Sequence, residues 1–400
     1  MDPGRPRHRG GWQPIVTFRW IDDDVALDAV IDRIIVEPRY AMDTEFHRER
    51  TYFPRLALVQ LGWADEIVLV DPLAVDARRL ARLFTSPSLA VLHAAQQDLD
   101  VLNHAVGAIP AQIYDTQLAA GFVGYSTPSL LALVQGELGQ TPAKGDRLTD
   151  WLRRPLTDAQ MNYAAADVQY LFELQDGIDA KLAAFGRSGW VAAACEELRT
   201  RPVGPIDPDL AWTKLKDARS LRSKARSVAQ GIAAWREREA RRTDSPVRHV
   251  LPDLAILGIS QRQPTTVEEL GQCRGVDDRH RRGRIAEALV GVVIASLERL
   301  SPTFESAGEE LDRSLRPAVS LVSAWVSQVA KDARIDTGML ATRNDLVALL
   351  RGDADARLRT GWRAELLGDD VTRLVDGRAG LTFDGHGGLR LIDAVAPANA

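Results

Sequence analysis

The chain has 400 residues, 45% of them hydrophobic, and a formal net charge of −5 at pH 7. This length predicts two or three domains, and the acidic balance argues against a general nucleic-acid-binding protein. The two cysteines, Cys195 and Cys273, lack metal-ligand or disulfide spacing, and the longest apolar run, 288–296, is too short to cross a bilayer. We therefore expect a cytoplasmic protein without a membrane segment.

The N-terminal half mixes strand and helix patterns, which predicts a mixed sheet with helices packed on it. Only Ala64 and Asp65 separate two of the strands, so this part of the sheet is expected to be an antiparallel hairpin. The predicted strands are 40–46, 55–63, 66–71 and 89–94, and the predicted helices are 25–35, 74–84, 96–106, 129–138 and 158–182.

A proline-rich segment, 199–209, ends this pattern, and the strand signal then disappears. Residues 211–300 show helical patterns only. A second loose stretch, 300–310, precedes a further helical block at 315–375. We therefore expect an α/β domain followed by two all-α domains.

The first candidate site lies in the strand predicted at 40–46. Asp43 and Glu45 are two residues apart, so both side chains point to the same face of the strand. Like charges side by side repel each other, and Met42 and Phe46 beside them are apolar, so a positive group is expected between the carboxylates. A basic side chain and a metal ion both satisfy this requirement.

Four other residues carry candidate chemistry. Tyr163 and Asp167 stand at i and i+4 of a predicted helix and share one face, as an ordinary surface pair also would. Asp98 falls on the first turn of a helix, where the helix dipole alone favours a carboxylate. Asp115 is expected to cap a helix or to accept buried hydrogen bonds, and a supporting contact behind the site residues is the alternative.

The combination is more informative than each part. Four carboxylates that meet at one sheet edge cannot all stay ionised without divalent cations, and oxygen ligands favour Mg²⁺ or Mn²⁺. Two such ions, about 3.5–4 Å apart, activate a water and stabilise the leaving oxygen in phosphodiester hydrolysis. Asp167 is then tolerated in its alanine-rich helix because a cation offsets its burial.

Three segments resemble the motifs of the DEDD superfamily of 3′–5′ exonucleases, in its tyrosine-bearing subgroup. They are "DTEF" at 43–46, "HAAQQDLDVL" at 93–102 and "YAAAD" at 163–167. The intervening "TYFPRLALVQLG", "YDTQLAAGFVG" and "DRLTDWLRRPLTDAQ" extend the resemblance to the ribonuclease D family. "WTKLKDARSL" at 212–221 is similar to the start of the HRDC module, and 337–368 looks like a second, more divergent copy.

The resemblance implies a ribonuclease H-like mixed-sheet exonuclease domain at 1–200, an HRDC domain at 209–299 and a second all-α HRDC-like domain at 312–392. It also implies roles for the site residues. Asp43 would bridge two divalent ions, Mg²⁺ or Mn²⁺. Glu45 and Asp167 would hold the ion on the nucleophile side, and Asp98 the other. The Tyr163 hydroxyl would orient the attacking water.

The activity implied by the resemblance is removal of nucleotides from RNA 3′ ends as nucleoside 5′-monophosphates. It also implies tRNA precursors as a candidate substrate and a monomeric enzyme. One alternative is the same chemistry on DNA, because nothing in the motifs contacts a 2′-OH. Another is a non-catalytic nucleic-acid-binding scaffold, against which the presence of all four carboxylates and the tyrosine argues.

Residues outside the carboxylate set are candidates for substrate contacts. Phe46 and His47 follow the first motif, where a terminal nucleotide can stack on an aromatic ring. Residues 211–242 carry 10 basic and 3 acidic residues, which can follow a phosphate backbone or form an ordinary solvated face. The candidate phosphate contacts are Lys214, Lys216, Arg219, Arg222, Lys224 and Arg226.

Overall fold

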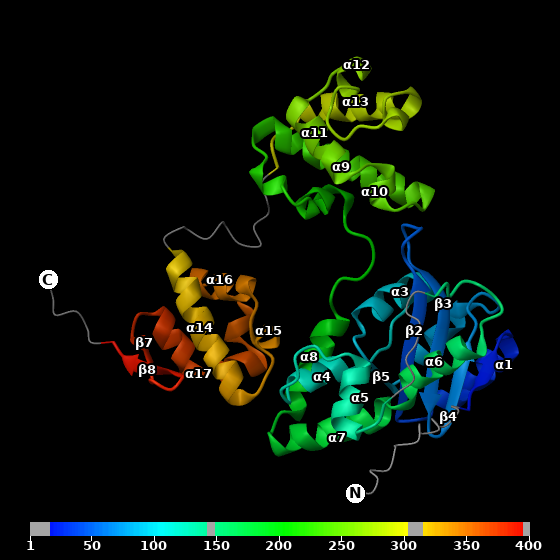
Figure 1. Ribbon diagram of the computed structural model, residues 1–400, viewed down its shortest axis with the longest axis vertical. Coiled ribbons are helices and arrows are strands. Elements are labelled where there is room, and N and C mark those ends of the chain that lie inside the picture. Colours follow the sequence, from blue (N-terminus) through cyan, green and yellow to red (C-terminus); the bar gives the residue numbers. More distant parts are fainter. Residues whose placement is uncertain (1–16, 142–148, 303–314, 395–400) are drawn as a thin grey trace, which may run out of the picture. The chain divides into compact units, whose positions relative to one another are not determined.

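The computed structural model describes residues 17–141, 149–302 and 315–394 (Figure 1). These residues form two compact units. The first unit contains the described residues of Met1–Phe46, Leu56–Pro202 and Arg313–Ala400, and the second those of His47–Arg55 and Val203–Asp312. None of the helices in the described parts of the chain has the length and apolar character needed to cross a membrane.

A six-stranded mixed sheet forms the centre of the first unit. Its strands are β1 (Arg19–Ile21), β2 (Arg39–His47), β3 (Arg55–Trp63), β4 (Glu66–Val70), β5 (Leu89–Leu92) and β6 (Ile113–Asp115). Their order is β1-β4-β3-β2-β5-β6, which places β2 in the interior of the sheet. β1 is parallel to β4, and β5 is parallel to both β2 and β6. The predicted hairpin is confirmed, because β3 and β4 pair antiparallel across a turn at Ala64 and Asp65.

Helices pack on this sheet and continue the chain. They are α1 (Asp24–Ile34), η1 (Ala77–Leu80), α2 (Ala81–Phe84), α3 (Gln96–Val106), α4 (Thr116–Gly121), α5 (Leu130–Leu138), α6 (Asp158–Gln169), α7 (Leu171–Ala184) and α8 (Ser188–Arg199). The single helix predicted at 158–182 is in fact two, α6 and α7, which meet at Tyr170. A hydrophobic layer that includes Leu58, Leu69 and Ala164 joins α6 to the sheet.

The C-terminal helices belong to the first unit. They are α14 (Arg316–Ala333), α15 (Thr337–Leu340), α16 (Arg343–Arg351), η6 (Arg357–Arg359) and α17 (Gly361–Val375). The Trp362 ring of α17 stacks on Trp190 of α8 with 5.7 Å between centroids, and Glu197 of α8 pairs with Arg357 and Arg363. The expectation of helices only is wrong at the end of this block, where β7 (Ala379–Phe383) and β8 (Leu389–Asp393) form an antiparallel hairpin.

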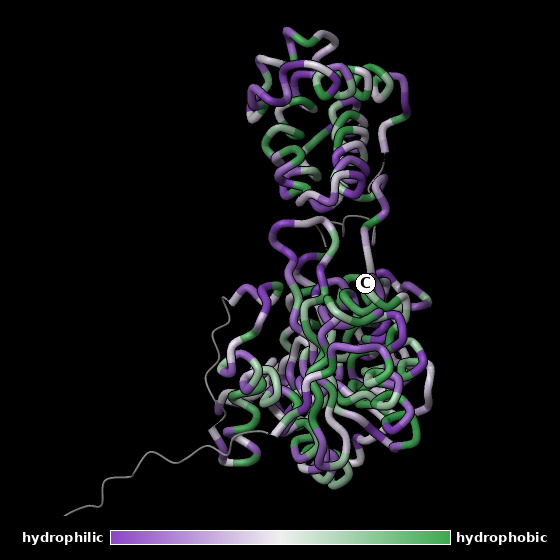
Figure 2. The backbone as a smooth tube through the Cα atoms, turned by 90° about the vertical axis from the view of Figure 1, so that its right-hand side faces the viewer, coloured by the Kyte–Doolittle hydropathy of each residue, from purple (hydrophilic) through white to green (hydrophobic). Residues whose placement is uncertain are grey.

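The second unit is helical apart from the segment 47–55. Its elements are η2 (Pro208–Lys214), η3 (Ala218–Ser220), α9 (Ser223–Thr243), α10 (Val247–Val250), α11 (Asp253–Arg262), α12 (Val267–Leu270), η4 (Asp278–His280) and α13 (Gly283–Glu298). Trp212, Ile232, Ile256 and Leu289 share one buried core. Hydrophobic and hydrophilic residues alternate along these helices in Figure 2, as expected when each helix buries one face.

Candidate active site

Three of the four candidate carboxylates meet beside the interior strand β2. Asp43 and Glu45 lie on one face of β2, and Asp167 comes from the last turn of α6. One oxygen of each carboxylate lies within 4.8 Å of an oxygen of the other two, and all three residues are partly buried. Helix α6 is started by a capping box formed by Thr157 and Gln160, which fixes the register that presents Asp167.

The fourth carboxylate, Asp98, lies next to this group but outside it. It occupies the first turn of α3, is 6% exposed and accepts a hydrogen bond from the Thr44 hydroxyl of β2. Its charge is felt at Asp43, whose pKa it helps to raise. Thr44 was not singled out from the sequence. Its hydrogen bond to Asp98 joins elements that are distant in sequence, and no local pattern signals it.

Tyr163 and Asp167 share one face of α6, as predicted. The pKa of the Tyr163 hydroxyl is raised by burial, by the charges of Asp167, Glu45 and Asp43, and by a hydrogen bond to Asp167. The Tyr163 ring lies 6.2 Å from that of Trp151, centroid to centroid. The hydroxyl is therefore a neutral donor at physiological pH, held beside the carboxylates.

The electrostatics of the site favour a bound cation. Burial, then the charges of Asp98, Asp167 and Glu45, raise the pKa of Asp43 well above its usual range. Burial and the charges of Asp167 and Asp98 raise the pKa of Glu45 to about 8, and burial raises that of Asp98 to about 7. Within the described residues, neither Asp43 nor Glu45 forms an ion pair with a Lys or Arg. This all-oxygen donor set fits a hard divalent cation.

These shifts predict how stability depends on pH when metal is removed with EDTA. The folded carboxyls hold protons that the unfolded ones release, so the free energy of unfolding falls as pH rises from the ordinary carboxyl range to about 8. In EDTA we expect the Tm to fall as the pH rises from about 5 to about 8. Added Mn²⁺ should raise the Tm most at about pH 8. Glu45→Gln should flatten the EDTA profile. An equal slope in both proteins would contradict this assignment.

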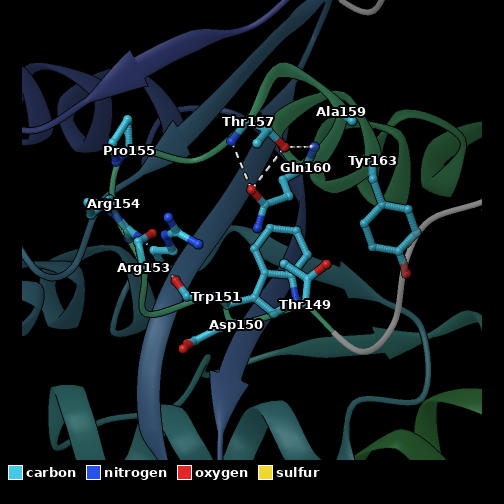
Figure 3. A pocket seen from close by; sticks show the side chains of 10 residues that line it. All are labelled: Thr149, Asp150, Trp151, Arg153, Arg154, Pro155, Thr157, Ala159, Gln160 and Tyr163. Atoms are coloured by element: carbon cyan, nitrogen blue, oxygen red, sulfur yellow. Dashed lines mark hydrogen bonds between the residues drawn. The ribbon is translucent and has the colours of Figure 1, made fainter.

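A cavity of about 730 Å³ opens beside Tyr163, at the N-terminal end of α6 (Figure 3). Figure 3 shows Trp151 and Gln160 between Arg153 on one side and Tyr163 on the other. The side chain of Arg153 is exposed and has no ion-pair partner among the described residues. The lining residues are Thr149, Asp150, Trp151, Arg153, Arg154, Pro155, Thr157, Ala159, Gln160 and Tyr163.

Arg154 holds the loop that forms this cavity. Its guanidinium donates to both carboxylate oxygens of Asp71, at 2.8 and 2.7 Å, and to the carbonyls of Ala57 and Trp151, at 2.7 and 2.8 Å.

Replacing Arg154 by alanine would leave the buried Asp71 carboxylate without its ion-pair partner. We therefore expect Arg154→Ala to lower the free energy of unfolding by about 3–5 kcal/mol, as measured by urea denaturation. Arg153→Ala is the matched control, with an expected change below about 0.5 kcal/mol. Equal effects of the two substitutions would show that Arg154 is no anchor.

The predicted substrate-contact residues have different surroundings. Phe46 and His47 end strand β2, are partly buried, and are not part of the described lining of the cavity. Lys214, Lys216 and Arg222 are exposed. Two other candidates contact backbone instead: Lys224 donates to the Arg299 carbonyl at 2.9 Å, and Arg226 to the Leu221 carbonyl at 2.9 Å. The side chain of the sixth, Arg219, lies outside the described part.

Two family models match the chain. Residues 18–183 match a family described as 3′–5′ exonuclease, and residues 225–293 match the HRDC domain. Exonucleases of the first family depend on divalent metal ions, which fits the carboxylate cluster. Together with the mixed sheet, these matches confirm the predicted fold class.

Relatives cover nearly the whole chain. The ribonuclease D of Acidiphilium cryptum is 36% identical over 379 residues, which is 92% of this chain and 95% of that protein. The ribonuclease D of Jannaschia sp. is 37% identical over 375 residues, covering 90% and 96%. The crystal structure of Escherichia coli RNase D, an exoribonuclease involved in structured RNA processing, superposes with a TM-score of 0.82 at 27% identity, covering 90% and 99%. The chain belongs to the ribonuclease D family.

Proposed function

We propose that this protein is a 3′–5′ exoribonuclease that hydrolyses RNA from its 3′ end to nucleoside 5′-monophosphates. The observation that carries the proposal is the meeting of Asp43, Glu45 and Asp167 beside Tyr163, with Asp98 adjacent. The similarity to curated ribonucleases D over most of the chain supports RNA as the substrate class.

The proposal includes two divalent ions, Mg²⁺ or Mn²⁺. Asp43, Glu45 and Asp167 would hold one ion, and Asp43 together with Asp98 would hold the other. When bound, such a pair activates the attacking water and stabilises the leaving oxygen. The grouping of three carboxylate oxygens within 4.8 Å supports the first site, and the charge coupling between Asp98 and Asp43 supports the second.

The protein groups orient the reactants. In this proposal the Tyr163 hydroxyl, which now donates to Asp167, holds the attacking water in line with the scissile phosphate. The cavity between Tyr163 and Arg153 holds the substrate strand, and the exposed Arg153 guanidinium contacts a phosphate. Phe46 and His47 are retained as candidate contacts to the terminal nucleotide.

The helical second unit is proposed to contribute RNA affinity. The exposed Lys214, Lys216 and Arg222 are suited to phosphate contacts. Lys224 and Arg226 are weaker candidates because their donors are directed to backbone carbonyls. Arg219 remains a candidate from the sequence alone. Binding through these residues should weaken steeply with salt.

The proposal extends to the natural substrate, the oligomeric state, the cellular location and the domain boundaries. We propose tRNA precursors as substrates, a monomeric enzyme and a cytoplasmic location, the last favoured by free, buried cysteines. The HRDC match supports the proposed HRDC domain at 209–299, beside an exonuclease domain at 1–200 and a third domain at 312–392.

The test compares a 5′-labelled single-stranded RNA with DNA of the same sequence, in Mg²⁺ and in Mn²⁺. We expect the RNA to shorten stepwise from its 3′ end, with nucleoside 5′-monophosphates released and no reaction in EDTA. Equal or faster loss of the DNA would favour the DNA exonuclease instead. Binding of both strands without cleavage would favour the non-catalytic scaffold.

A further inference from the structure

The turn that leads into helix α3 has no support of its own. It comprises His93, Ala94 and Ala95, between β5 and α3. Ala94 has a φ of +59°, a left-handed conformation that is unfavourable for a residue with a Cβ atom. Ala95 occupies the N-cap position of α3 and provides no side-chain hydrogen bond. The start of α3 must therefore be held from elsewhere.

Asp115, at the end of β6, supplies that support. Its carboxylate accepts hydrogen bonds from the N–H groups of Ala94 at 3.1 Å and Ala95 at 2.9 Å. It also accepts from Gln117 at 2.9 Å and Leu118 at 3.1 Å, which caps α4 as the sequence predicts. Asp115 is 3% exposed, so its four hydrogen bonds are shielded from water. One carboxylate thus joins the beginnings of two helices.

A second contact ties the same turn to the same segment. His93 Nδ1 lies 2.9 Å from the Thr116 hydroxyl, and Nε2 lies 3.1 Å from the Pro128 carbonyl. The Thr116 hydroxyl in turn donates to the Leu92 carbonyl at 3.0 Å. The turn is therefore anchored at His93 as well as at Ala94 and Ala95.

The turn matters because Asp98 lies three residues beyond it, in the first turn of α3. Asp98 is not part of the close group of Asp43, Glu45 and Asp167, so its distance from Asp43 depends on where α3 begins. We propose that Asp115 is a positioning residue that fixes the carboxylate of Asp98 for the divalent ion it shares with Asp43. This inference rests on the proposed two-ion site.

The substitution Asp115→Asn separates the two roles of Asp115. An asparagine oxygen in place of Oδ1 can still accept from Ala94, Gln117 and Leu118, which keeps the α4 cap. Its NH₂ group would then face the N–H of Ala95, where Oδ2 now accepts. One of the two hydrogen bonds that hold the turn before α3, the one from Ala95, is therefore lost, while the α4 cap is kept.

Two measurements on the full chain test this. Hydrogen exchange in EDTA should be about 10-fold faster at 93–98 in Asp115→Asn than in wild type. Calorimetric titration with Mn²⁺ should show one site weakened by about 10–100-fold and the other retained. The matched control is Asp23→Asn, which alters the N-cap of α1, where Asp23 accepts from Ala26 at 2.8 Å. It should leave both Mn²⁺ sites intact.

Unchanged exchange at 93–98, or equal weakening of both Mn²⁺ sites, would overturn the positioning role of Asp115. A wild-type chain that binds two Mn²⁺ ions but degrades no RNA would contradict the proposed function. The Mn²⁺ titration of Asp115→Asn would then still decide the positioning role of Asp115. A wild-type chain that binds no Mn²⁺ would remove both the two-ion site and the positioning role.

Discussion

Replacing Asp43 by asparagine is expected to lower kcat on RNA by about 10³-fold or more, because the loss of several kcal/mol of metal-dependent stabilisation corresponds to that factor. Burial and the charges of Asp98, Asp167 and Glu45 all raise the pKa of Asp43. An amide at this position removes the one carboxylate proposed to serve both ions. Single-turnover cleavage of 5′-labelled RNA measures the effect.

The control for Asp43→Asn is the thermal stability of the variant, measured as its Tm in EDTA. The substitution removes a buried carboxyl that must either take up a proton or be repelled by its neighbours on folding, so the Tm in EDTA should stay equal or rise. Near-normal cleavage by this variant would mean that Asp43 is not a metal ligand. A large loss of Tm would assign its effect to folding instead.

Removing the Tyr163 hydroxyl is expected to lower kcat by about 10²-fold, within the range for a positioned group that acts on a proton or on water in the transition state. Tyr163→Phe keeps the ring, which lies beside Trp151, and deletes the donor that is bonded to Asp167. KM for RNA and Mn²⁺ affinity should change little, because the hydroxyl is proposed to act on the water rather than on the ions.

Tyr125→Phe is the matched control. The Tyr125 hydroxyl donates a hydrogen bond to Glu137 at 2.6 Å, and Lys181 donates to the same carboxylate. Tyr125 is not among the residues that line the cavity beside Tyr163. Its hydroxyl should be dispensable for cleavage. If Tyr163→Phe retained wild-type kcat, the tyrosine would have a packing role only. A rise in KM without a fall in kcat would place it in substrate binding.

Much of the sheet could be predicted from the sequence because long apolar strands carry a strong pattern. The interior strands β2 to β5 were found, whereas β1 and β6 were missed because three residues are too few for an alternating pattern to be read. The hairpin β7–β8 was missed for a related reason, since its two short strands follow a long helical block. The break at Tyr170 has no Gly or Pro to mark it.

Each pair with local spacing lies on one shared face, as predicted, because local spacing determines the direction of a side chain. Asp43 and Glu45 follow the period of a strand, and Tyr163 and Asp167 that of a helix. Asp98 stands on the first turn of a helix, as predicted, but its hydrogen bond from Thr44 could not be predicted, because it joins two elements that are distant in sequence. The anchors Arg154 and Asp115 act through residues distant in sequence, which no local pattern reveals.

The most direct test of the two-ion site is a crystal structure of the protein with Mn²⁺ and a nucleoside 5′-monophosphate, with anomalous scattering measured at the manganese edge. The account predicts two anomalous peaks about 3.5–4 Å apart, one among Asp43, Glu45 and Asp167 and the other between Asp43 and Asp98. A nucleotide phosphate should lie against both peaks, with Tyr163 beside it. Absence of a peak at these carboxylates in Mn²⁺-saturated crystals would contradict the account.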